Sequence, residues 1–193
     1  MRPAFTTDPL ANALFVATVV VWTLSEFQQA LRHRSNAEQS DRNSLFVLRL
    51  CIGGGVLLGA FALRVGTTYF GFSPFSFAIG LLLMWIGIAL RWWSFRTLGR
   101  YFTFKVMTSQ DQPIITMGPY RYLRHPSYAA ILLALIGIGL AFGNWLSVVV
   151  LAGVPALGLV YRIRVEEAAL STALGASYTE YATGRKRMVP LLW

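Results

Sequence analysis

Residues 118–128 read GPYRYLRHPSY, a polar stretch with strongly apolar sequence on both sides. It contains Arg121, Arg124 and His125, one of only 2 histidines in the chain. Arginine and tyrosine favour the headgroup layer of a membrane and proline ends helices, so a juxtamembrane anchor would explain this composition. A binding site for a charged ligand would explain it as well. The rest of the chain decides between these two interpretations.

The composition is that of an integral membrane protein. Hydrophobic residues make up 55% and charged residues 13% of the 193 residues, whereas soluble globular domains carry roughly 25% charged residues. The length suits one domain, which we expect to cover residues 1–193. The single cysteine, Cys51, lies in an apolar run, which excludes a disulfide framework or a cysteine-rich metal site. The N-terminal residues lack the features of a cleaved signal peptide, so the first apolar run is expected to remain as a span.

The apolar runs predict an all-α, polytopic fold with about five transmembrane helices. We expect spans at about residues 10–31, 45–65, 75–95, 128–142 and 145–163. The fourth run would cover only ~22 Å of a hydrocarbon core of ~30 Å. Gly143 and Asn144 separate it from the fifth run, so a tight helical hairpin is predicted there, and Pro155 is expected to kink the last span.

Glycines at positions 53, 54, 55 and 59 mark the second span. Small residues of this kind allow membrane helices to approach one another closely. A phosphate-binding loop is excluded, because no strand precedes these glycines and no lysine follows them.

Lysine and arginine are distributed unevenly between the loops. Fifteen of the 17 fall on the side that holds the loop after the first span, the long loop 97–127 and the C-terminal tail. The positive-inside rule places this side in the cytoplasm, with the N-terminus outside. Membrane topology therefore accounts for the net charge of +9 without a nucleic acid partner.

A second charged cluster follows the fifth apolar run. The helix is expected to continue beyond the membrane and to end at Gly175, a residue type common at helix C-termini. Arg162 and Glu166 lie four residues apart, and Arg164 and Glu167 lie three apart, so each pair can meet on one helix face. An exposed, salt-bridged helix is the structural alternative. Because both charged clusters fall on the same side of the bilayer, we expect them to converge in one pocket.

The order of these clusters resembles the isoprenylcysteine carboxyl methyltransferase family and, in part, the phospholipid N-methyltransferases. The features are GPYRYLRHPSY, a short helical hairpin, R-x-x-x-E-E-x-x-L-x-x-x-x-G-x-x-Y-x-x-Y and a proline near the end, over about residues 98–190. The family commonly has phenylalanine where this chain has Leu174. The residues in register are Gly118, Pro119, Tyr120, Arg121, Arg124, His125, Pro126, Tyr128, Arg162, Glu166, Glu167, Gly175, Tyr178, Tyr181 and Pro190.

The resemblance implies methyl transfer from S-adenosyl-L-methionine, with S-adenosyl-L-homocysteine as product. It implies a catalytic region of about residues 98–193, whose cytosolic cofactor pocket is formed by the long third loop and the C-terminal helices. Arg162 and Glu167 are the predicted catalytic residues. The predicted cofactor-binding residues are Tyr120, Arg121, Arg124, His125, Pro126, Tyr128, Glu166, Glu167, Tyr178 and Tyr181.

Side-chain chemistry agrees with this cofactor. A glutamate can hold its ammonium group, Arg124 and His125 can hold its carboxylate, and aromatic faces can stabilise its sulfonium. No strand–loop–helix pattern of a soluble methyltransferase is present. His33, His125 and the scattered carboxylates have no metal-binding spacing, so no metal is expected.

The acceptor stays open. A lipophilic, isoprenylcysteine-like carboxylate is ionised at neutral pH and needs no general base, whereas a phospholipid amine would require Glu166, Glu167 or His125 as base. Sterol reductases that use a nicotinamide cofactor resemble the family around the RHP motif, but they are longer and tend to lack the paired glutamates. A non-enzymatic membrane protein or transporter is less well supported, since the chain has no internal repeat and few ionisable groups within its central apolar runs.

Overall fold

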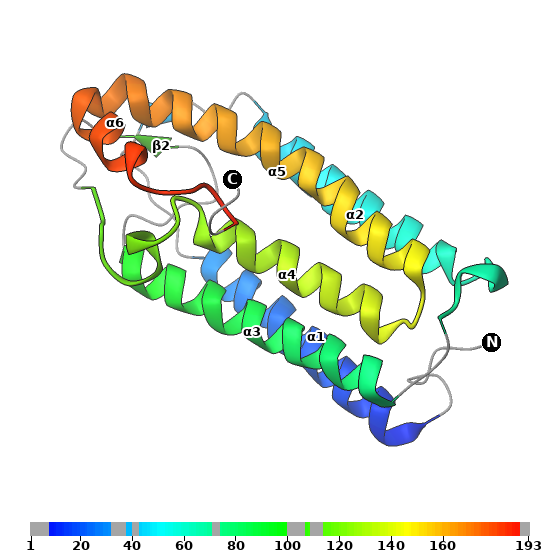
Figure 1. Ribbon diagram of the computed structural model, residues 1–193. Helices are drawn as coiled ribbons and strands as arrows, with labels where there is room; N and C mark the ends of the chain where they lie inside the picture. Colours follow the sequence, from blue (N-terminus) through cyan, green and yellow to red (C-terminus); the bar gives the residue numbers. More distant parts are fainter. Residues whose placement is uncertain are drawn as a thin grey trace.

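The computed structural model describes residues 8–31, 38–39, 43–70, 74–99, 107–108 and 114–189. Pro190, His33 and residues 101–105 lie outside this part of the chain. Figure 1 shows long helices that run side by side. The elements in chain order are α1 (Pro9–Ala30), β1 (Glu38–Gln39), α2 (Ser44–Ala62), η2 (Gly66–Thr68), α3 (Pro74–Leu98), β2 (Met107–Thr108), η4 (Gly118–Arg121), α4 (Pro126–Ala141), α5 (Trp145–Leu174) and α6 (Ala176–Thr183).

The chain is a multi-pass membrane protein with an α-helical fold, as predicted. Helices α1, α2, α3 and α5 are long and apolar enough to cross a membrane, and α4 is a shorter apolar helix of 16 residues. Large apolar side chains such as Leu24, Phe46 and Leu57 are exposed on the outer surface, where lipid would surround them. The short fourth helix and the order of the spans agree with the sequence prediction.

Helix α5 is much longer than its apolar part. Its 30 residues correspond to a length of about 45 Å, against ~30 Å for the hydrocarbon core. It continues through Pro155 and ends at Gly175, whose φ of 56° suits a glycine C-cap. The end that carries Glu166 and Glu167 therefore projects beyond the apolar layer, as the sequence predicts.

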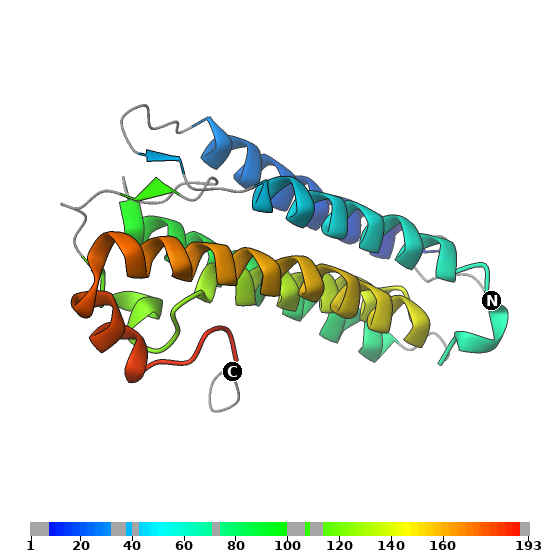
Figure 2. The same ribbon diagram turned by 90° about the horizontal axis from the view of Figure 1, so that it is seen from above.

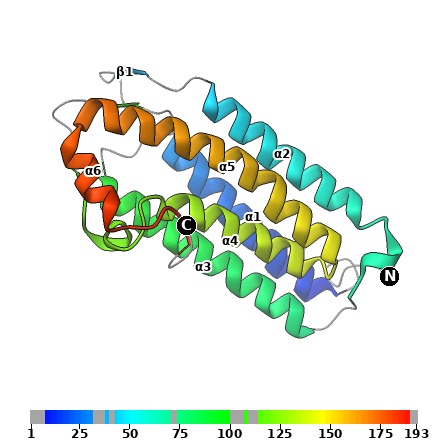
Figure 3. The ribbon, with the colours of Figure 1, turned by 45° about the horizontal axis from the view of Figure 1, so that its top comes forward.

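The helices form two packed pairs that α4 and α5 join. Helix α3 packs along α4, α2 packs along α5, and α4 packs against α5. Viewed from above, α1 and α2 lie on one side of the layer formed by α3, α4 and α5 (Figure 2). Helix α6 and the C-terminal segment fold back over one end of the bundle (Figure 3). At this end the two predicted half-motifs meet.

Backbone-to-backbone contact at glycines sets the distance between α3 and α4. A Cβ atom added at Gly80 would lie 2.6 Å from the carbonyl oxygen of Gly137. In α2, Gly55 and Gly59 also allow a close approach, in their case to the side chains of Pro155 and Leu151 of α5, as the sequence predicts. The flanking glycines 53 and 54 are different, because a Cβ atom there would have no neighbour within 4 Å.

We expect Gly80→Ala to lower the free energy of unfolding by about 1–3 kcal/mol, because the new methyl group collides with the backbone of α4. Gly53→Ala is the matched control and should cause no loss, because its methyl group enters open space and alanine favours a helix by roughly 0.5–1 kcal/mol. Thermal unfolding of both variants in detergent micelles measures the difference. Equal losses in the two variants would contradict close α3–α4 packing as the cause.

Asn144 holds the predicted hairpin between α4 and α5. Its side chain is fully buried and accepts a hydrogen bond from the Ser147 N–H at 3.0 Å. Its amide nitrogen donates to the Ala62 carbonyl at 3.2 Å and to the Thr68 hydroxyl at 2.8 Å. The hairpin is therefore tied to the end of α2, which fixes α5 against that helix.

The loops at the site end also approach one another. Strand β1 from the first loop pairs antiparallel with β2 from the long third loop, with Glu38 opposite Thr108. Two loops that both carry basic residues therefore lie on the same side of the bundle. This arrangement agrees with the charge-based prediction that they share one side of the membrane.

Candidate active site

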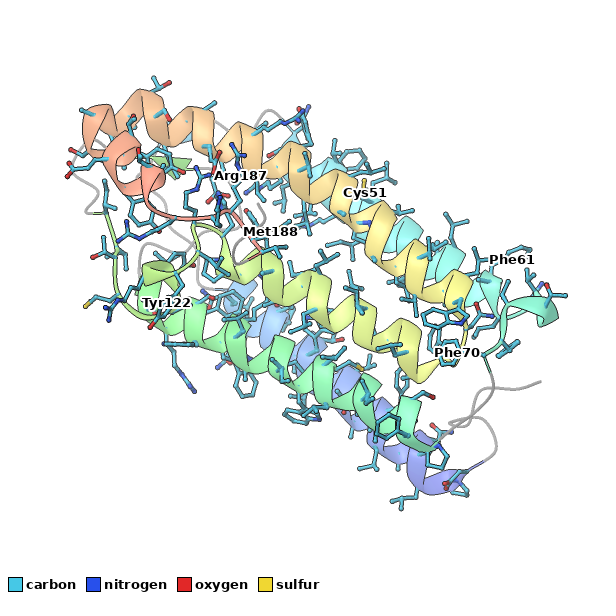
Figure 4. The ribbon with its side chains drawn as sticks, in the orientation of Figure 1. Cys51, Phe61, Phe70, Tyr122, Arg187 and Met188 are labelled. Atoms are coloured by element: carbon cyan, nitrogen blue, oxygen red, sulfur yellow. The ribbon has the colours of Figure 1, made fainter. Side chains whose placement is uncertain are left out.

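The C-terminal segment pairs with the GPYRYLRHPSY stretch. The backbone N–H of Arg124 donates to the Lys186 carbonyl at 2.8 Å, and that of His125 donates to the Arg187 carbonyl at 2.8 Å. Met188 then enters a buried cluster with side chains of α2 and α5. Arg187 and Met188 lie between α5 and α4 (Figure 4). The tail thus forms part of the site wall.

Glu167 of α5 lies at the centre of a cluster of ion pairs. Its Oε1 is 2.8 Å from Arg124 Nη1 and 3.1 Å from His125 Nε2. Its Oε2 accepts from both Nε and Nη2 of Arg187 at 2.9 Å. A carboxylate oxygen only accepts hydrogen bonds, so the Nε2 atom of His125 carries the proton. The two half-motifs, 42 residues apart at this contact, therefore share one site, as predicted.

A second network surrounds Tyr128. Its hydroxyl donates to Glu166 Oε2 at 2.7 Å and accepts from Arg162 Nε at 3.2 Å. Arg162 is 1% exposed, and its Nη1 donates to the Ser44 hydroxyl of α2 at 2.6 Å. The Tyr128 and His125 rings stack with centroids 5.6 Å apart, which connects this network to the Glu167 cluster. Arg162 and Glu166, expected to meet on one helix face, are joined through the Tyr128 hydroxyl.

Three tyrosines, two from α6 and one from η4, form one wall of the site. The Tyr181 hydroxyl donates to the Tyr120 carbonyl at 3.1 Å, and the Tyr178 and Tyr181 rings are 6.0 Å apart. Burial raises the pKa of Tyr120 well above its usual range and also raises the pKa of Tyr178, with the Glu167 charge adding to the latter. Burial raises the pKa of Tyr181 to about 12, although the nearby Arg185 cation lowers it. These phenols therefore stay neutral at physiological pH and can donate hydrogen bonds.

Two predicted cofactor-binding residues, Arg121 and Pro126, are not part of the ion-pair cluster around Glu167. The Arg121 side chain is exposed, and its guanidinium carbon lies 5.9 Å from the centre of the Tyr122 ring. Within the described part of the tail, Arg121 is contacted through its carbonyl, which accepts from Arg185 Nε at 3.2 Å. Pro126 is buried as the first residue of α4. Its fixed φ suits this position, so Pro126 shapes the start of the helix.

A pocket of about 300 Å³ lies beside the cluster. Its lining is rich in cationic side chains and consists of Arg124, Ala182, Thr183, Gly184, Arg185, Lys186 and Arg187. Two buried side-chain atoms in the described residues have no hydrogen-bond partner, the Nε of Arg124 and the hydroxyl of Tyr178. Buried polar atoms are normally satisfied, so these two donors indicate a place for a ligand acceptor group.

The arrangement suits binding of a charged organic ligand. Cations outnumber carboxylates around the pocket, while Glu166 and Glu167 provide acceptors on α5. In the part of the chain that the structure describes, no group of three or more His, Cys, Asp or Glu side chains could hold a metal ion.

The site also contains residues outside the predicted set. Arg187 binds Glu167, and Ser44 binds Arg162. The run GRKR at 184–187 is visible in the sequence as a basic tail, but a lipid headgroup would explain it equally well. Ser44 carries no sequence signal, because only the packing of α2 on α5 brings it to Arg162.

Comparison with known proteins agrees with the half-motif resemblance. Residues 78–172 match the model of the isoprenylcysteine carboxyl methyltransferase (ICMT) family. Protein-S-isoprenylcysteine O-methyltransferase A of Arabidopsis thaliana is 33% identical over 115 residues, which covers 58% of each chain. The uncharacterized protein YpbQ of Bacillus subtilis is 30% identical over 94 residues, which covers 45% of this chain and 56% of YpbQ. The chain spans just over half the length of these relatives.

A solved structure shares the fold. The eukaryotic intramembrane Ras methyltransferase ICMT superposes with a TM-score of 0.63 at 24% sequence identity, over 72% of this chain and 52% of the other. The likeness extends beyond the matched segment to most of the helical bundle. Residues 78–172 of this chain are therefore similar in sequence to the isoprenylcysteine carboxyl methyltransferase family, and the helical bundle shares the fold of a solved ICMT.

Proposed function

We propose that this protein transfers a methyl group from S-adenosylmethionine to the carboxylate of a lipophilic, isoprenylcysteine-like acceptor. The observation that carries the proposal is the cluster in which Arg124 and His125 meet Glu167 of α5. The cluster lies beside a cationic pocket at the end of a membrane bundle. The match of residues 78–172 to the ICMT family model supports methyl transfer as the reaction class.

The side chains around the cluster fit the methionine end of the cofactor. The Nε of Arg124 and the hydroxyl of Tyr178 are buried donors that can bond its carboxylate. Glu166 and Glu167 supply acceptors for its ammonium group. When bound, the cofactor supplies a methyl group on a positively charged sulfur, and the faces of Tyr178 and Tyr181 can stabilise that charge.

Arg162 is assigned to the acceptor. Its guanidinium is buried where α5 meets α2 and α4, held by the Tyr128 and Ser44 hydroxyls. A carboxylate acceptor is already ionised at neutral pH, so the site needs to remove its water and orient it. Such alignment can contribute several kcal/mol to the rate. The excess of cations favours an anionic acceptor over an amine, which would compete with Arg124, Arg162 and Arg187 for the same carboxylates.

We also propose that the site faces the cytoplasm, with the N-terminus outside. The basic loops and the basic tail that carry most of the lysine and arginine lie at the site end of the bundle. The positive-inside rule assigns that end to the cytoplasm.

The test uses the purified full chain in micelles. We expect S-adenosylhomocysteine to bind in calorimetry, and labelled S-adenosylmethionine to methylate an S-isoprenylated cysteine with a free carboxylate. The product should release labelled methanol in alkali, because a methyl ester hydrolyses and a methylated amine does not. Phosphatidylethanolamine serves as the alternative acceptor.

Each contrary outcome has a distinct meaning. Alkali-stable label on the phosphatidylethanolamine amine, with none on the carboxylate, would replace the acceptor and keep methyl transfer. Tight NADPH binding without S-adenosylhomocysteine binding would overturn the proposed reaction class in favour of a reductase.

A further inference from the structure

An ion pair joins α1 to α3, away from the residues assigned above, and the side chain of its arginine is buried while that of its glutamate is partly exposed. Arg91 of α3 is 5% exposed, and its Nε donates to Glu26 Oε1 of α1. Its Nη2 donates to Glu26 Oε2 at 2.7 Å. Charges within membrane helices are costly and are retained where they have a function. Glu26 also lies outside the segment 78–172 that matches the family model.

The third nitrogen of the Arg91 guanidinium, Nη1, binds the GPYRYLRHPSY stretch. Its Nη1 donates to the Ser127 carbonyl at 3.0 Å and to the Ser127 hydroxyl at 2.5 Å. Ser127 lies in the first turn of α4, two residues after His125. One planar guanidinium thus binds a carboxylate on one helix and two oxygens on another, which fixes their relative position.

The start of α4 has no side-chain cap of its own. His125 is its N-cap residue, yet the His125 side chain makes no capping hydrogen bond. The imidazole is directed to Glu167 instead, at 3.1 Å. Pro126 at the first helical position has no N–H to donate. The hydrogen bonds from Arg91 to Ser127 therefore support a first helical turn that lacks a side-chain cap.

We propose that Glu26 and Arg91 act as a positioning pair that holds the first turn of α4 and thereby directs the His125 imidazole toward Glu167. Glu26 aligns the guanidinium, and Arg91 transmits that alignment to Ser127. The functional meaning of this pair rests on the proposed function, since His125 belongs to the proposed donor site. Neither Glu26 nor Arg91 contacts substrate in this proposal.

Nuclear magnetic resonance of the imidazole tests the proposal without any ligand. The chain has 2 histidines, so the His33→Gln background leaves His125 as the single source of imidazole signals in micelles. Glu26→Gln is expected to shift the His125 ring signals or split them into two sets. Asp8→Asn is the matched control. It also removes one carboxylate from the α1 region, at the N-cap of that helix, and should leave the His125 signals unchanged.

A swapped pair separates positioning from simple stabilisation. Glu26→Arg combined with Arg91→Glu keeps opposite charges between α1 and α3 but presents no donor to Ser127. We expect thermal stability to recover toward the parent while the His125 signals stay altered. Unchanged His125 signals in folded Glu26→Gln would overturn the proposal, as would their full restoration by the swap.

Arg91→Lys covers the case in which Glu26→Gln does not fold. It keeps a cation opposite Glu26 and loses the fork that reaches Ser127, so the same altered His125 signals are expected. Unchanged signals would again overturn the pair. Calorimetry of the parent with S-adenosylhomocysteine reports on the proposed function separately, so either idea can fail while the other stands.

Discussion

Glu167→Gln is expected to abolish detectable binding of S-adenosylhomocysteine and to lower methyl transfer by about 100-fold or more, the scale seen when a catalytic group is misplaced by about 1 Å. The amide removes the negative charge that Arg124, His125 and Arg187 share. It also places an NH2 group against donors that need an acceptor. Repulsion between the Arg124 and Arg187 cations should then separate the tail from the GPYRYLRHPSY stretch.

Calorimetry and a methyl-transfer assay measure the two effects, and thermal unfolding in micelles checks the fold. Glu180→Gln is the matched control, because Glu180 is an exposed carboxylate on α6 outside the cluster. Glu167→Asp keeps the charge on a shorter side chain and should retain part of the binding. Wild-type affinity in a folded Glu167→Gln protein would remove Glu167 from the donor site.

Arg162→Ala has the second large expected effect. We expect turnover to fall by about 100-fold while S-adenosylhomocysteine still binds, because Arg162 aligns the acceptor and does not contact the Glu167 cluster in our assignment. The substitution also removes the hydrogen bonds that Arg162 donates to the hydroxyls of Tyr128 and Ser44. A reduced free energy of unfolding is therefore expected as well, by about 1–3 kcal/mol for buried polar groups that lose their partner.

Arg164→Ala is the control for this variant. Arg164 lies two residues further along α5 and is exposed, so both turnover and stability should stay near the parent values. Arg162→Lys keeps the charge but cannot bond two hydroxyls from one planar group, so most of the loss should persist. Parent-like turnover in Arg162→Ala would move the acceptor site elsewhere.

The helices could be predicted because hydropathy is a local property. The predicted start of every span falls within two residues of the observed helix start. Helix α5 ends well beyond the last apolar run, and the charged residues after 163 predicted this extension. The hairpin at Gly143 and the C-cap at Gly175 follow from the conformations that glycine tolerates.

The partners of the charged residues could not be predicted in this way. Helical spacing suggested that Glu167 could pair with Arg164, whereas the structure pairs it with Arg124, His125 and Arg187 from two other segments. Glu26 and Arg91 lie in different apolar runs, near the ends of the first and third predicted spans. The bundle brings them together across 65 residues.

The sequence by itself determined that this chain spans a membrane, where its helices begin and end, and that its charged residues gather at one end. Each of these depends on the free energy of transferring a short segment into lipid, which neighbouring residues set. Only the tertiary structure decided which carboxylate meets which cation, because an ion pair needs side chains within about 4 Å. That distance depends on how α1, α3, α4 and α5 pack, and so on residues far apart in the chain.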